Sequence, residues 1–287
     1  MNKILLLPLL LLLHACTVQT IFDNLGPKDR ESRVANRNIS FGPLSEQALD
    51  IYVPLESTGK DPVLMFIYGG SWKNGDKDGY DFVGRAFAAR GFITVIADYR
   101  KVPEVVFPTF VEDGALAVKW ISENITDWNG DPSRIYLVGH SAGAYNAVML
   151  GLDPQYLATV GLDSDTVDGV AGIAGPYDFF PYDVAATIDA FGHIQDPDIT
   201  QPINLATPDA PPMLLVMGTD DTVVFPRNIP ALEKALQENS IRVETRLYEG
   251  LDHIEPVTAL SVTFRKKAPV LDDITGFFIN IDETMTK

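Results

Sequence analysis

The sequence GHSAG at residues 139–143 places a serine between two glycines. A serine hydroxyl attacks a carbonyl carbon when a neighbouring base accepts its proton. The G-x-S-x-G spacing alone is common, but here the apolar run IYLV precedes it and the alanine-rich run AYNAVML follows it. A sharp strand-to-helix turn would expose the hydroxyl, with glycines where larger side chains would clash. The pattern predicts that Ser141 is a nucleophile, and the alternative is a tight turn with a capping serine.

The base for this serine must come from a small set, because the chain has four histidines. His14 lies in an apolar N-terminal leader, and the side chain of His140 is expected to point away from its neighbour Ser141. His193 follows no predicted strand, whereas His253 follows the predicted strand RVETRLY in a polar loop. Elimination and position therefore predict His253 as the general base.

A carboxylate is needed to orient the imidazole of this base. The segment GTDD at residues 218–221 follows a predicted strand and offers Asp220 and Asp221. Both precede the candidate histidine and follow the candidate serine in the sequence. Asp98 and Asp113 are interpreted instead as residues that brace loops or cap helices.

Predicted strands and helices alternate along most of the chain, which predicts a mostly parallel sheet with helices on both faces. Loops at the carboxyl ends of such strands carry the functional site. The segment 45–54 alternates apolar and polar residues and stops at a proline, so we expect an edge strand there. The remaining strands are expected within residues 61–70, 92–100, 135–139, 167–175, 211–221 and 242–250, and the helices within 80–91, 109–125, 141–150, 229–240 and 270–281.

These segments resemble the α/β-hydrolase superfamily, and more narrowly its esterase/lipase group with an HGG-type loop and a GHSAG elbow. Carboxylesterases, feruloyl- and acetyl-esterase-like enzymes and kynurenine formamidases share these features. The resemblance covers about residues 48–253 and rests on LDIYVP, YGGSW, ADYR, FPTFVEDGALAVKW, GDPSRIYLVGHSAGA and GTDDTVV, in that order. It implies an α/β-hydrolase fold with a small cap insertion, and a serine esterase that acts on a small-molecule ester and needs no cofactor.

An ester hydrolase must stabilise an oxyanion, and each rigid backbone N–H donor is worth ~3 kcal/mol. The segment YGGSW at residues 68–72 ends a predicted strand. The resemblance implies that the amides of Gly70, Ser71 and Ala142 are these donors, and that Gly69 permits the turn. The alternative is a glycine turn before a helix.

The family pattern bears on three further positions. It places the catalytic aspartate three residues after a glycine, which selects Asp221, three residues after Gly218, with Asp220 as the alternative. It usually has histidine at the position of Tyr68, where a tyrosine could brace the loop through its hydroxyl. Trp72 is expected to anchor the same loop by packing.

The segment between residues 175 and 212 is predicted to be loop-like, and it is aromatic. In the family, insertions at this place often form a cap over the site. An apolar lid would suit an acyl or aryl group and exclude water. Packing of the insertion onto the core explains the same aromatic residues equally well, which are Tyr177, Phe179, Phe180, Tyr182 and Phe191.

The N-terminus carries one lysine followed by an apolar run, which predicts a signal peptide over residues 1–15. The sequence LHAC, which ends at Cys16, resembles the bacterial lipobox, and this implies lipidation of that cysteine. Residues 16–37 are interpreted as a polar tether and residues 38–287 as one hydrolase domain. We therefore expect an exported protein whose lipid holds it to the bacterial envelope, at the outer membrane or facing the periplasm; the alternative is a plain signal peptide.

The composition narrows the classes of partner. The formal net charge is −17, which disfavours nucleic acid as a partner. There is no His/Cys cluster or H-E-x-x-H segment, so no metal is expected. The oligomeric state is left unspecified. Two other functions stay open, namely an amidase, formamidase or peptidase with the same triad, and a catalytically silent binding protein.

Overall fold

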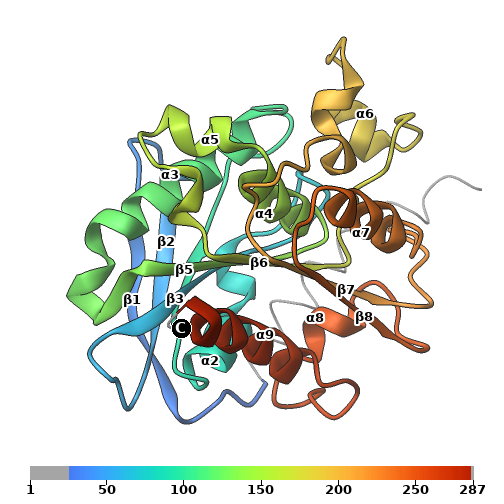
Figure 1. Cartoon of the computed structure of the whole chain (residues 1–287). Coiled ribbons are helices and arrows are strands. Elements are labelled where there is room, and N and C mark those ends of the chain that lie inside the picture. The colour runs from blue at the N-terminus through green and yellow to red at the C-terminus, as the bar shows by residue number, and fades with distance from the viewer. Residues whose placement is uncertain (1–25, 286–287) are drawn as a thin grey trace, which may run out of the picture.

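The computed structural model describes residues 26–285 and contains one eight-stranded sheet (Figure 1). The strand order is β1-β2-β4-β3-β5-β6-β7-β8. Strands β3 to β8 are parallel, and β2 is antiparallel to both of its neighbours. The predicted mostly parallel sheet is therefore confirmed. The predicted signal peptide and Cys16 lie outside the described residues.

The elements follow the predicted alternation closely. The strands are β1 (Ser32–Ser40), β2 (Ala48–Pro54), β3 (Asp61–Ile67), β4 (Ile93–Ala97), β5 (Gly130–His140), β6 (Gly169–Ile173), β7 (Met213–Gly218) and β8 (Val243–Tyr248). The helices are α2 (Asp81–Ala88), α3 (Thr109–Asn124), α4 (Ala142–Leu152), α5 (Pro154–Thr159), α6 (Ala185–Phe191), α7 (Asn228–Glu238), α8 (Glu255–Thr258) and α9 (Val270–Met285).

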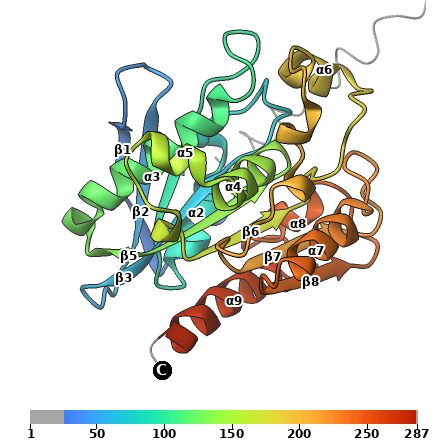
Figure 2. The same ribbon diagram turned by 45° about the horizontal axis from the view of Figure 1, so that its top comes forward.

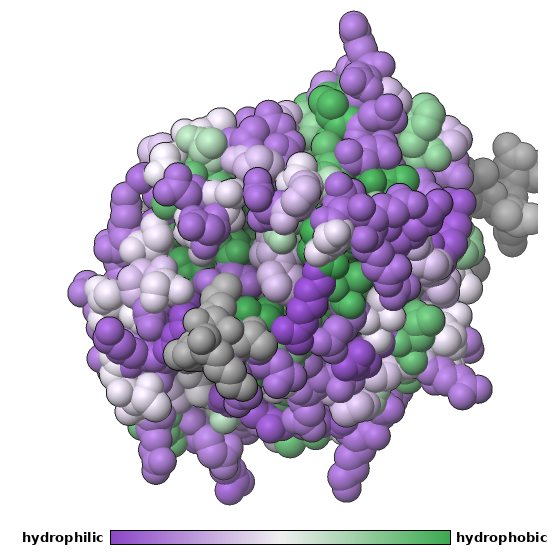
Figure 3. Space-filling view, in the orientation of Figure 1, coloured by the Kyte–Doolittle hydropathy of each residue, from purple (hydrophilic) through white to green (hydrophobic). Residues whose placement is uncertain are grey.

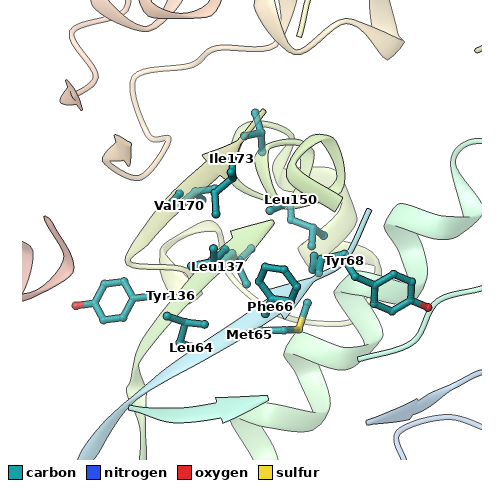
Figure 4. Close-up of a cluster of buried hydrophobic side chains, with 14 of the residues drawn as sticks. Leu64, Met65, Phe66, Tyr68, Tyr136, Leu137, Leu150, Val170 and Ile173 are labelled. Carbon is teal, nitrogen blue, oxygen red and sulfur yellow. The ribbon is translucent and has the colours of Figure 1, made fainter. Parts of the chain in front are cut away.

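Helices cover both faces of the sheet because its central strands are apolar on both sides. Helices α3, α4, α5 and α7 lie on one face, and α2 and α9 lie on the other (Figure 1). Figure 4 shows the side chains of β3, β5 and β6 packed in one cluster with Leu150 of α4. Figure 3 shows that hydrophilic residues cover most of one face of the molecule. Within residues 26–285 we find no helix with the length and apolar character needed to cross a membrane.

The predicted boundary between tether and domain is corrected by β1. Ser32 pairs with Pro54 and Ser40 pairs with Ala48, so residues 32–37 belong to the sheet and not to a tether. The segment 45–54 is consequently not an edge strand, because β1 covers it. β1 is not predicted from the sequence, because it is largely polar and because two register shifts interrupt its alternation. Asp29, just before it, is held by two hydrogen bonds of 2.7 and 2.8 Å from Arg265.

The insertion between β6 and β7 contains more regular structure than the predicted loop. It includes α6 and two 3-10 turns, Pro197–Thr200 and Pro202–Asn204. Figure 2 shows that α6 projects from the layer that contains α4 and α7. The insertion leaves the sheet at the carboxyl end of β6, which is the edge where the candidate catalytic loops emerge.

Candidate active site

The turn between β5 and α4 has the geometry that the GHSAG segment predicts. Ser141 is the single residue between the two elements, with φ 55° and ψ −120°. This conformation costs a non-glycine residue ~1–3 kcal/mol. A Cβ atom on Gly143 would lie 2.0 Å from the carbonyl oxygen of Ile67 in β3, and one on Gly139 would lie 2.2 Å from that of Gly143. The glycines are therefore required by close backbone approach.

Three side chains from three strand ends form a continuous chain of hydrogen bonds. Nε2 of His253 lies 2.9 Å from Oγ of Ser141, and Nδ1 of His253 lies 2.7 Å from Oδ2 of Asp221. All three residues are buried. The structure therefore brings together the serine, histidine and aspartate that the sequence singled out, in an arrangement that can move a proton away from the serine hydroxyl.

The structure distinguishes between the two adjacent acids. Asp221 Oδ1 accepts hydrogen bonds of 2.9 Å from the backbone amides of Val223 and Val224. Burial raises the pKa of the Asp221 carboxyl, but hydrogen bonds from His253 and these amides outweigh it and bring the pKa below its usual value. The carboxylate is therefore ionised and held in place. Asp220 is exposed.

The glycine loop after β3 lies directly against the turn that carries the serine. A Cβ atom on Gly69 would lie 2.9 Å from the Cβ of Ser141. The amides of Gly70, Ser71 and Ala142 donate no hydrogen bond within the part of the chain that the structure describes. They are therefore available to an oxyanion, and their role as its donors stays a prediction.

Tyr68 braces this loop through its hydroxyl. The hydroxyl donates to Oδ1 of Asp98 at 2.6 Å and accepts from Nζ of Lys101 at 2.9 Å. The Tyr99 hydroxyl donates to the carbonyl oxygen of Tyr68 at 3.0 Å, and the two rings stack. Burial raises the pKa of Tyr68, so the hydroxyl stays protonated and remains a donor. The sequence predicts a brace through this hydroxyl but does not indicate its partners.

Replacing Tyr68 with phenylalanine is expected to lower kcat for p-nitrophenyl acetate by ~10-fold, because the loop loses its fixed position. The free energy of unfolding should fall by about 1–3 kcal/mol, since Asp98 loses a buried donor. Steady-state kinetics and urea unfolding measure the two effects. Tyr136→Phe is the matched control, because it removes a tyrosine–carboxylate hydrogen bond to Asp282 away from the catalytic edge. Equal kcat values for the two variants would contradict the assigned bracing role.

The other two acids considered in the sequence are structural. Asp98 accepts hydrogen bonds from Tyr68 and from a backbone amide. Asp113 accepts bonds from the guanidinium of Arg100 and from the side chain of Gln47. Both brace loops, as expected. Within residues 26–285, no group of three or more His, Cys, Asp or Glu side chains is arranged to hold a metal ion.

His140 connects the serine turn to the loop of the histidine. Its Nε2–H donates to the carbonyl oxygen of His253 at 3.0 Å. Burial, followed by the proximity of His253, lowers the pKa of His140 to about 3, so its ring is neutral. The sequence predicts that this side chain points away from Ser141 but does not indicate its contact with His253.

The buried neutral ring of His140 predicts a loss of stability in acid. Its pKa is about 3 in the folded chain, against the ordinary value of 6.5 that applies to the unfolded one. The unfolded state binds the extra proton as the pH falls below 6.5, so stability decreases from there towards pH 3. The loss reaches about 3 kcal/mol between pH 8 and pH 4.5. His140→Gln keeps a donor but does not titrate, so urea unfolding of this variant should lose that part of the pH dependence. An unchanged dependence would contradict the assignment.

Comparison with known proteins shows the family and the fold. Residues 49–236 match the model of the family described as BD-FAE. A probable isoprenylcysteine alpha-carbonyl methylesterase of Oryza sativa subsp. japonica is 28% identical over 76% of the chain and 57% of its own length. Esterase LipC of Mycobacterium tuberculosis is 32% identical over 67% of the chain and 52% of its own length. The chain thus spans about half the length of these curated relatives.

Solved structures agree on the architecture. Esterase B from Lactobacillus Rhamnosis aligns with a TM-score of 0.81 at 18% identity, over 96% of each chain. A truncated carbohydrate esterase from gut microbiota aligns with a TM-score of 0.77 at 21% identity, over 89% of this chain and 99% of that one. These likenesses show that the chain has the α/β-hydrolase fold.

Proposed function

The chain belongs to the BD-FAE family, and from this premise we propose that it is a serine carboxylic-ester hydrolase that forms an acyl-enzyme. The hydrogen-bonded series of Asp221, His253 and Ser141 carries the proposal. The relatives described above are an esterase and a methylesterase by name, which favours esters as the substrate class.

The hydrogen bonds among these three side chains support the following acylation step. Oγ of Ser141 attacks the ester carbonyl carbon while Nε2 of His253 takes the hydroxyl proton. Asp221 holds Nδ1–H and stabilises the imidazolium that forms. The imidazolium then gives its proton to the alkoxide oxygen of the leaving alcohol, and the acyl group remains on the serine.

The oxyanion of each tetrahedral intermediate is stabilised by the amides of Gly70, Ser71 and Ala142, each worth ~3 kcal/mol in the transition state. In the second half of the reaction, His253 takes a proton from water, the hydroxide attacks the acyl carbon, and Ser141 leaves with its proton restored. The products are a carboxylic acid and the free enzyme.

The test compares p-nitrophenyl acetate with p-nitroacetanilide, which share the acyl group and differ in the bond cleaved. We expect turnover of the ester with an initial burst of one p-nitrophenol per active site, and hydrolysis of the anilide at least ~10³-fold slower, because amide leaving groups are poorer. Comparable rates on both substrates would assign an amidase instead. If the protein hydrolyses neither substrate, the function is instead that of a binding protein that keeps the fold.

We further propose export and lipid anchoring at Cys16, supported by the sequence LHAC. Ser32 starts β1 opposite the end of β2, at the amino ends of the parallel strands. The described chain therefore enters the sheet at the end opposite the catalytic edge. Incorporation of labelled palmitate into the wild type but not into Cys16→Ser is the expected result, and equal labelling of both would contradict the anchor.

A further inference from the structure

The loop expected to hold the oxyanion has a backbone that needs external support. Gly70, Ser71 and Trp72 have consecutive positive φ angles of 131°, 57° and 56°. For the two non-glycine residues this region is sparsely populated and unfavourable. The amides of Lys73 and Asn74 donate to the carbonyl oxygen of Gly70 at 3.0 and 2.9 Å. These bonds close the turn but do not fix its orientation towards the serine.

Trp72, next to the predicted donor Ser71, ties the loop to its surroundings. Its Nε1–H donates to Oδ1 of Asn146 in α4 at 3.1 Å. Its ring meets that of Tyr145 edge-on at 5.4 Å and that of Phe191 edge-on at 4.9 Å. Tyr145 and Asn146 belong to the helix that follows the nucleophile, whereas Phe191 ends α6 of the insertion. The anchoring of the loop by Trp72 therefore involves both α4 and the insertion.

Phe191 is the centre of this aromatic cluster and is fully buried. Its ring lies 4.9–5.8 Å from the rings of Trp72, Phe107, Phe110, Tyr145, Phe179 and Tyr182. The backbone around it is also fixed, because the amide of Phe107 donates to the carbonyl oxygen of Ala190 and Nε2–H of His193 donates to that of Phe107, both at 3.0 Å. The end of α6 is thus a rigid support.

A second contact holds the loop one residue after Trp72. Nζ of Lys73 lies 2.5 Å from Oδ2 of Asp189, which is in α6. The pair is partly exposed, so it adds little to stability by itself. The ion pair helps to fix the position of the loop, because α6 contacts both Trp72 and Lys73, the two residues that follow the predicted donor Ser71.

The insertion therefore has a fixed part and an exposed part. Four of its five aromatic residues pack inward, while Phe180 is 53% exposed. Of the two explanations that the sequence left open, packing onto the core applies to Tyr177, Phe179, Tyr182 and Phe191.

We propose that α6 positions the oxyanion loop, with Phe191 as the main positioning residue and Asp189 as a weaker one. The inference rests on the proposed function. Loosening Phe191 lets Trp72 shift, and the amides of Gly70 and Ser71 then lose their alignment on an oxygen that carries charge only in the transition state. The consequence is a lower kcat with little change in KM, since a transition-state contact is lost and ground-state binding is not.

The experiment compares Phe191→Leu with the wild type on p-nitrophenyl acetate. We expect kcat to fall ~10- to 100-fold with KM within about 2-fold. The inhibition constant of a trifluoromethyl ketone, which forms an oxyanion on the serine, should rise by the factor that kcat/KM falls. Phe278→Leu is the matched control, because Phe278 is equally buried but packs on Tyr136 across the sheet. This control should lose similar stability in urea and keep kcat.

Asp189→Asn provides a second variant that leaves the core intact. We expect kcat to fall ~2- to 5-fold at low salt, and the wild type to approach the variant in 1 M NaCl, where the ion pair with Lys73 is screened. If the wild type hydrolyses the ester while both variants keep its kcat, the positioning role is wrong and the proposed function stands. If the folded wild type shows no turnover, the proposed function fails instead.

Discussion

Replacing Ser141 with alanine is expected to lower kcat for p-nitrophenyl acetate by at least ~10⁴-fold, because no other group replaces the attacking oxygen. Among the contacts of residues 26–285 the hydroxyl makes one hydrogen bond, with Nε2 of His253, and the φ angle of 55° is set by β5 and α4 on either side. The variant should therefore remain folded, with a free energy of unfolding within about 1 kcal/mol of the wild type. Steady-state kinetics and urea unfolding measure the two quantities.

Ser261→Ala is the matched control for this variant. Ser261 is also buried, and its hydroxyl donates to the carbonyl oxygen of Thr258, so the substitution removes the same group without touching the candidate site. Its kcat should equal that of the wild type. If Ser141→Ala retains wild-type activity, the nucleophile has been assigned incorrectly.

Replacing Asp221 with asparagine is expected to lower kcat by ~10⁴-fold with little change of shape. The carboxylate accepts the Nδ1 proton of His253, which leaves Nε2 free to act as a base. An asparagine amide that donates to Nδ1 would favour the opposite tautomer, with the proton on Nε2, and the imidazolium would lose its counter-charge. Because the pKa of Asp221 lies below its usual value, the wild type should not lose activity through this group near neutral pH.

Asp220→Asn tests the neighbouring acid under the same conditions. Its carboxylate is exposed and accepts only from Thr219 among the described contacts, so kcat should stay within about 2-fold of the wild type. A large loss in Asp220→Asn together with normal activity in Asp221→Asn would reverse the assignment. Solvent-exposed Asp220 then would have to reach the imidazole by a rearranged loop.

The candidate catalytic residues are predictable from the sequence to different degrees. Ser141 was identified from local pattern, because a strand, a tight glycine turn and a helix are all encoded within a short segment. His253 required elimination among four histidines and the expectation that strand ends meet at one edge. Asp221 could not be separated from Asp220 by residue type, since both follow β7, and the family pattern made that choice. The structure supplies the reason, because Asp221 is the one buried against the imidazole.

Contacts between segments that lie far apart in the chain could not be predicted from the sequence. β1 is polar and irregularly paired, so its place in the sheet depends on β2 and not on its own pattern. The packing of Phe191 against Trp72 and the bond from His140 to the backbone of His253 join residues far apart in the chain. No local periodicity reports such contacts, whereas it does report which face of an element is apolar.

The most direct test of the account is the site of reaction with a fluorophosphonate, located by peptide mass spectrometry on the folded protein. Such a reagent reacts with a serine whose hydroxyl has been activated by a neighbouring base. We predict one adduct, on Ser141, and a much slower reaction in His253→Ala. A folded wild-type protein that leaves Ser141 unmodified, or that carries the adduct on another serine, would contradict the proposed relay.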